Sequence, residues 1–197
     1  MRKNIIRVKI PLERVGVLIG SEGHIKETIE KKFNLNLSID SQDGNVSIVG
    51  STSDPSLLFR ARDIVLAIGR GFSPEKAFLL FLEDLNLYII DLRELFESSS
   101  DIQRVKSRVI GRNGKTRHII EEETKTNISI YGYTISIIGD LEHLSIAREA
   151  IDMLIRGVLH RNVYRFLDMK RRDLKQTEME LWKSKPKSLR EGKKKNV

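Results

Sequence analysis

Two short segments bracketed by glycines carry the residues best suited to bind a charged ligand. Residues 19–23 have the sequence IGSEG and residues 110–114 the sequence IGRNG, with the two segments 91 positions apart. Glycine has no β-carbon, so the main chain can approach a bulky anion closely. At the start of a helix, such a loop directs free N–H groups and the positive end of the helix dipole toward that anion. The pattern therefore predicts two phosphate-binding loops.

Basic side chains favour the second loop. Residues 104–117 contain six Lys or Arg and no acidic residue. Lys and Arg add charge-assisted hydrogen bonds to a phosphate. The first loop instead has Glu22 between its glycines, with Glu13 and Glu27 close in sequence. Because a carboxylate repels a phosphate, we expect the second loop to provide most of the affinity and the first to bind weakly or to contact a protein.

The similarity between the two segments extends to the elements that must position each loop. At the same spacing of 91, Ile29 matches Ile120 and Asn36 matches Asn127. A repeat of this length indicates a duplicated structural unit. Apolar periodicity predicts the same order in each copy: a strand, a short helix, the glycine loop, a helix, a β-hairpin and a closing helix. The predicted elements are 4–10, 12–19, 24–33, 35–39, 46–48 and 54–68 in the first copy, and 85–92, 101–109, 115–124, 128–130, 133–138 and 141–155 in the second.

We therefore predict an α+β protein with two tandem units, each a three-stranded antiparallel sheet covered by three helices. The units span 3–71 and 85–157 and are separated by an acidic helical connector at 72–84. A C-terminal helix follows at 158–182, and a basic disordered tail at 183–197. The connector and the C-terminal helix are expected to pack the two units into one rigid body.

The composition of the 197 residues narrows the possible functions. The chain has no cysteine, which excludes disulfides and thiolate metal sites. Its net charge of +8 is concentrated in the tail, where seven of fifteen residues are Lys or Arg. The N-terminus lacks the apolar stretch of a signal peptide, and no apolar run approaches the roughly 18 residues of a membrane span. We expect a cytoplasmic protein that does not bind membranes.

Catalytic and metal-binding patterns are weak. Gly114-Lys115-Thr116 is similar to the end of a P-loop, but that motif needs a glycine where this chain has Val109. The four histidines lack ligand-like spacing, and Glu121 to Glu123 are typical of a solvated helix face. We therefore expect no enzyme activity, cofactor or metal. Tyr131 or Tyr133 could stack on a base, and Tyr164 is expected to be a packing residue of the last helix.

A glycine loop between two helices, followed by a hairpin, matches the KH module, which holds about four single-stranded nucleotides. The stretch RVIGRNGKTRHIIEEETKTNISIYGYTISIIGD resembles the second KH domain of a ribosome-assembly family, the archaeal and eukaryotic KH proteins known as the partner of the Nob endonuclease. The resemblance covers about residues 3–172. The glycines of the first loop also persist, which is similar to archaeal members.

The resemblance implies a protein with two type-I KH domains that binds single-stranded RNA in the 3′ region of small-subunit ribosomal RNA, or its precursor, during late subunit maturation. It further implies as partners the pre-small ribosomal subunit, the Nob-type endonuclease and the α subunit of translation initiation factor 2. The phosphate clamp would be Gly111, Arg112, Asn113 and Gly114, supported by Lys115, Arg117 and Arg108.

Base preference is expected from a groove beside Ile110 and the strand residues Ile128 and Ile130. A weaker RNA site is predicted at the first loop, comprising Gly20, Ser21, Gly23 and Lys26. Two alternatives stay open at this point. The chain could be a general KH accessory protein of mRNA or RNA decay, or a protein-interaction scaffold whose loops are vestigial.

Overall fold

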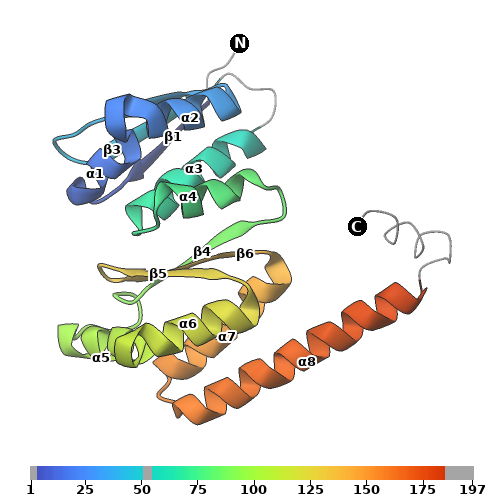
Figure 1. Ribbon diagram of the computed structural model, residues 1–197. Helices are drawn as coiled ribbons and strands as arrows, with labels where there is room; N and C mark the ends of the chain where they lie inside the picture. Colours follow the sequence, from blue (N-terminus) through green and yellow to red (C-terminus); the bar gives the residue numbers. More distant parts are fainter. Residues whose placement is uncertain (1–3, 51–54, 185–197) are drawn as a thin grey trace.

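A computed structural model describes residues 4–50 and 55–184, which form two units with the same order of elements (Figure 1). The first unit comprises β1 (Asn4–Lys9), α1 (Leu12–Ile19), α2 (His24–Phe33), β2 (Asn36–Ile39), β3 (Asn45–Gly50) and α3 (Ser56–Gly69). The second comprises β4 (Asn86–Asp91), α5 (Ser99–Ile110), α6 (Lys115–Thr124), β5 (Asn127–Tyr131), β6 (Thr134–Gly139) and α7 (Leu141–Ile155). The predicted succession of strands and helices is confirmed in both copies.

Each unit contains a three-stranded antiparallel sheet, with the orders β1-β3-β2 and β4-β6-β5. Alternate residues of the central strands are buried against the helices of the same unit, such as Val46 and Ile48 in β3 and Ile135 and Ile137 in β6. This period of two explains why the strands could be recognised from apolar alternation. The fold is thus mixed, with one hydrophobic core per unit.

Helix α5 shows how amphipathic spacing prepares one face for a ligand. Ile102, Val105 and Val109 are buried in the core of the second unit. Their spacing of three and four residues places them on one side of the helix. The basic residues Arg104 and Arg108 therefore lie off the buried stripe.

The second sheet is covered on both faces. Its other face packs against the segment after α3, which forms α4 (Pro74–Ala77) and a 3-10 helix (Phe78–Phe81). Ile138 of β6 belongs to the same hydrophobic cluster as Phe72, Ala77 and Leu80. In Figure 1, α3 and α4 lie between the two sheets. The segment after α3 therefore packs between the two sheets.

Polar contacts reinforce this junction. The Ser129 hydroxyl donates to the Arg70 carbonyl at 2.8 Å, and the Tyr131 hydroxyl donates to Glu13 Oε1 at 2.7 Å. The hydrogen bond from Tyr131 holds the pKa of Glu13 below its usual range. Burial, followed by the contact with Glu13, raises the pKa of Tyr131. Since Arg14 also covers the Tyr131 ring, 5.7 Å from its centroid, this tyrosine belongs to the junction between units.

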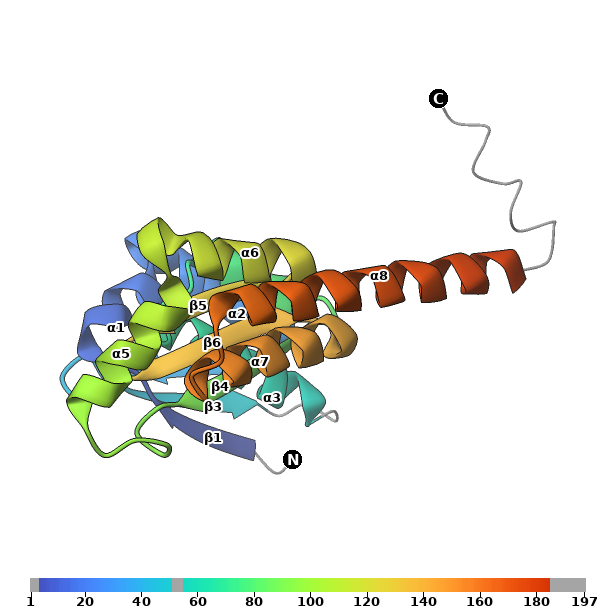
Figure 2. The same cartoon turned by 90° about the horizontal axis from the view of Figure 1, so that it is seen from below.

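Helix α8 (His160–Ser184) does not join the two units, so the expected role of the C-terminal helix in their packing is wrong. It packs on α6 and α7 of the second unit, where it buries Val163 and Leu167. Its later turns extend away from the body of the protein (Figure 2). The predicted basic tail lies outside the described residues from position 185 onward. No helix in the described ranges is long and apolar enough to cross a bilayer.

The junction predicts unequal effects of two glycine substitutions. Gly71 has a φ of +96°, and an added β-carbon would lie 2.7 Å from the Tyr131 β-carbon. We expect Gly71→Ala to lower the free energy of unfolding by about 2 to 4 kcal/mol, through backbone strain and overpacking. Gly157→Ala is the matched control, because its φ is +88° but nothing lies within 4 Å. It should cost only about 1 kcal/mol. Equal losses in chemical denaturation would contradict the tight junction.

Candidate nucleic-acid interface

The second glycine loop has a backbone shape that few residue types adopt. Gly111 ends α5 with a φ of 74°, and Asn113 and Gly114 have φ values of 53° and 76°. Asn is among the few non-glycine residues that tolerate this region. A single 3-10 turn, Arg112–Gly114, leads directly into α6, whose first turn has no side-chain cap. The Gly114 N–H bonds to the Gly111 carbonyl, and the Lys115 N–H bonds to the Arg112 carbonyl. The start of α6 therefore offers an anion chiefly the positive end of the helix dipole.

The two glycines of this loop are needed for different reasons. A β-carbon on Gly111 would lie 2.2 Å from Thr116 Oγ1, so only glycine fits against the start of α6. A β-carbon on Gly114 would meet nothing within 4 Å. Gly114 is thus required by its positive φ and leaves open space above the main chain. That space is where a phosphate could approach.

The basic residues of the loop are exposed, as a phosphate clamp requires. The side chains of Arg112 and Lys115 form no hydrogen bond or ion pair within the described part of the chain, and Asn113 is exposed beside them. Arg117 lies 3.6 Å from Glu121, one helical turn away, so its charge is partly balanced. The structure brings Gly111 to Lys115 together on one surface, with Arg117 at its edge.

Arg108 has a structural role that the sequence does not indicate. Its Nε donates to the Leu154 carbonyl at 3.1 Å and its Nη2 to the Val158 carbonyl at 2.6 Å. Leu154 lies in the last turn of α7, where its carbonyl also accepts from the Gly157 N–H, and Val158 follows the helix. In the first unit, Arg14 binds the corresponding carbonyls of Ile68 and Phe72. Arg108 therefore fixes α5 to α7, and its contact with phosphate stays a prediction.

The apolar residues predicted to contact bases differ in their exposure. Ile110 and Ile130 are half-buried, whereas Ile128 is only 3% exposed and packs in the core of the second unit. Ile128 therefore has almost no surface to offer a base. Tyr133 is 51% exposed, with the Arg93 guanidinium 5.5 Å from its ring centroid. Of the two tyrosines considered, it is the more exposed.

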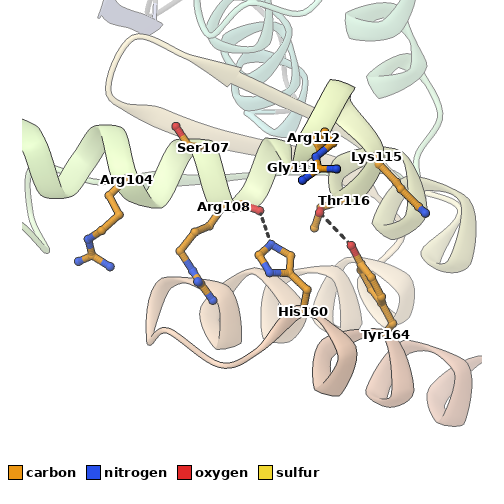
Figure 3. A pocket seen from close by; sticks show the side chains of 9 residues that line it. All are labelled: Arg104, Ser107, Arg108, Gly111, Arg112, Lys115, Thr116, His160 and Tyr164. Carbon is orange, nitrogen blue, oxygen red and sulfur yellow. Dashed lines mark hydrogen bonds between the residues drawn. The ribbon is translucent and has the colours of Figure 1, made fainter.

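A hollow of about 510 Å³ lies between the loop, α5 and the first turns of α8 (Figure 3). It is lined by Arg104, Ser107, Arg108, Gly111, Arg112, Lys115, Thr116, His160 and Tyr164. Thr116 and Tyr164 share a hydrogen bond of 2.9 Å between their hydroxyls, and His160 Nε2 lies 3.0 Å from the Arg108 carbonyl oxygen. Helix α8 thus braces the loop through the residue on which Gly111 packs.

The sequence does not predict this arrangement. It indicates only a packing role for Tyr164, and it assigns no role to His160. Tyr164 is 48 positions from Thr116, and no local pattern links them. Only the course of α8 across α6 brings them together.

The first loop has the same backbone shape but different chemistry. Gly20, Glu22 and Gly23 have φ values of 73°, 52° and 80°, close to those of the second loop. Ser21 and Glu22 are exposed, and Lys26 Nζ lies 3.8 Å from Glu30. The loop therefore keeps the form of a phosphate clamp without a free cation among Gly20, Ser21, Gly23 and Lys26.

Comparisons with known proteins agree with this geometry. Residues 86–172 match a family model described as a eukaryotic-type KH domain of type I. A KH domain-containing protein of Methanocaldococcus jannaschii is 47% identical over 93% of this chain and 81% of its own length. The RNA-binding protein pno1 of Dictyostelium discoideum is 31% identical over 82% of this chain and 70% of its own.

A solved structure extends the likeness to three dimensions. It is the complex of a/eIF2alpha, aDim2p and rRNA from Pyrococcus horikoshii OT3, in which one chain matches with a TM-score of 0.81 and 46% identity. The match covers 87% of this chain and 96% of that one. With the loop geometry and the sequence relatives, these likenesses show that the chain belongs to the Pno1/Dim2 family of KH-domain proteins.

Proposed function

We propose that this protein is a non-catalytic, single-stranded RNA-binding factor for assembly of the small ribosomal subunit. The observation that carries the proposal is the exposed loop Gly111–Lys115, whose basic side chains have no acidic partner in the described residues and whose main chain opens onto an uncapped helix. The name of the D. discoideum relative and the presence of rRNA in the P. horikoshii complex support RNA as the ligand.

Binding would begin at the sugar–phosphate backbone. The positive end of the α6 dipole attracts a phosphate above Gly114, while Arg112 and Lys115 add charge-assisted contacts. Bases of the unpaired strand then lie against Ile110 and Ile130. Because a KH groove holds about four nucleotides, most of the affinity comes from a few phosphates and falls with salt.

Both copies are assigned as KH domains of type I, spanning 3–71 and 85–157. The family match supports this for the second copy, and the shared element order and loop shape support it for the first. Glu22 makes the first copy a poor phosphate clamp. We assign it a structural or protein-binding role, with at most weak RNA contact.

The proposed RNA target is the 3′ region of 16S-type rRNA or its precursor within the assembling subunit, in the cytoplasm. The α subunit of translation initiation factor 2 is a proposed partner because the matching solved complex contains a/eIF2alpha. A Nob-type endonuclease is proposed as a second partner on the family resemblance. The protein would position RNA for such an enzyme without cleaving it.

Crosslinking in cells tests the target. We expect RNA crosslinked to this protein to be dominated by small-subunit rRNA precursor, with contacts clustered near its 3′ end. Sequencing the crosslinked fragments provides the measurement. A broad set of mRNAs would instead support the general mRNA or RNA-decay alternative.

The clamp is tested by the double substitution Arg112→Asp and Asn113→Asp. It removes a charge-assisted contact and adds repulsion, so binding of a short single strand should weaken by about 2 to 4 kcal/mol, or roughly 30- to 1,000-fold. Fluorescence anisotropy at several salt concentrations measures this, and the salt slope should fall by about 0.7 for each phosphate that the variant no longer neutralises.

A matched control changes the same two positions of the first loop, Ser21→Asp and Glu22→Asp. We expect little effect, because that loop already carries a carboxylate. If neither double variant alters affinity, both loops are vestigial and the scaffold alternative is correct. If the control weakens binding as strongly, the first loop is also a clamp.

The two glycines of the second loop should separate stability from binding. Gly111→Ala creates a clash with Thr116 and should lower the free energy of unfolding by about 2 to 4 kcal/mol. Gly114→Ala meets open space, so it should cost about 1 kcal/mol of strain but obstruct the phosphate and weaken RNA binding about tenfold. Thermal unfolding and anisotropy on both variants check this split. Unchanged RNA affinity in Gly114→Ala would place the phosphate elsewhere.

A further inference from the structure

The hollow beside the second loop is lined by residues of helices and of the loop. Its walls come from α5, the loop, the start of α6 and α8, and none of its lining residues belongs to a strand (Figure 3). Neither Ile110 nor Ile130 lines it, so it is distinct from the groove proposed for the bases. Its volume of about 510 Å³ lies within the usual range of small-ligand sites.

Every charged residue that lines the hollow is a cation: Arg104, Arg108, Arg112 and Lys115. Arg104 has a carboxylate partner, Asp101 at 2.9 Å, but exposed pairs of this kind are weak. Arg108 is bound only to main-chain carbonyls, which leave its positive charge unneutralised. Four cations around one concave surface create a potential that attracts anions.

The first copy shows that the fold does not need these charges. At the spacing of 91, the residues corresponding to the four cations are Glu13, Val17, Ser21 and His24. The element that follows the closing helix also differs, since α4 packs toward the second sheet whereas α8 crosses α6. The basic hollow is thus a property of the second copy alone within the described part of the chain.

Two rings from α8 complete the hollow. Tyr164 and His160 are half-buried, with ring centroids 6.3 Å apart and planes tilted by 59°. Tyr164 is held by its hydrogen bond with Thr116, and His160 by its contact with the Arg108 carbonyl. Fixed rings beside cations are the combination with which proteins bind single-stranded nucleic acids, through stacking and phosphate contacts.

We propose that this hollow is a second subsite for the same RNA strand, which takes a nucleotide beyond those held in the groove. The phosphate of that nucleotide contacts Arg104 and Arg112, and its sugar or base lies against Tyr164. The inference rests on the proposed function, since Arg112 and Lys115 lie between the groove and the hollow. The protein would then recognise a longer stretch of RNA than one KH groove.

The test compares RNA strands of two lengths by fluorescence anisotropy. One strand has about four nucleotides, and others extend it by about four more at the 5′ or the 3′ end. We expect one extension to tighten binding about tenfold, and Arg104→Glu to abolish that gain without changing affinity for the short strand. The salt slope for the extended strand should fall by about 0.7 in the variant.

Arg165→Glu is the matched control, because Arg165 is exposed on α8 but does not line the hollow. It should leave the gain from strand length unchanged. Arg112→Asp with Asn113→Asp should weaken both lengths, so failure of the clamp is distinguishable from failure of the subsite.

Two results would overturn the proposal: no gain from either extension, or equal effects of Arg104→Glu and Arg165→Glu. Circular dichroism on each variant verifies that the fold is intact.

Discussion

The close approach of Gly111 to Thr116 is the constraint on which the binding surface depends. It holds the tight turn between α5 and α6, and no side chain covers the start of α6. The same threonine hydroxyl bonds to Tyr164, which ties the turn to a helix from the far end of the chain. The loop is therefore held in shape before any ligand arrives, and binding costs less conformational freedom.

The two copies share the backbone shape of their glycine loops but differ in the side chains that these loops carry. Both glycine loops have nearly the same backbone angles, so the fold alone dictates their form. The charges differ, because Arg112 and Asn113 of one loop correspond to Ser21 and Glu22 of the other. Arg14 and Arg108 show the reverse case. They lie on different turns of their helices, yet they bind corresponding carbonyls in the two copies. Here the interaction recurs although the residue position does not.

The sequence predicted most of what is local. Apolar periods indicated the helices and strands, and paired glycines at equal spacing identified both loops, because each signal lies within a few residues. The junction between the units, the role of Arg108 and the contribution of His160 and Tyr164 could not be predicted. Each depends on segments 46 or more positions apart that meet only through packing. The burial of Ile128 could not be predicted either. Alternation shows on which face of the strand a residue lies, but not how much of its side chain is exposed.

The two sheets differ in how their outer faces are covered. The outer face of the second sheet, including Ile138, is covered by the first copy, whereas Ile5 on the corresponding face of the first sheet is 54% exposed. The outer face of the second sheet therefore depends on the first copy, whereas the outer face of the first sheet has no such cover at Ile5. Removal of the first copy would expose this apolar surface of the second, and the isolated second copy would tend to aggregate. The first copy could thus lose its own ligand-binding site during evolution and still be needed to cover the second sheet.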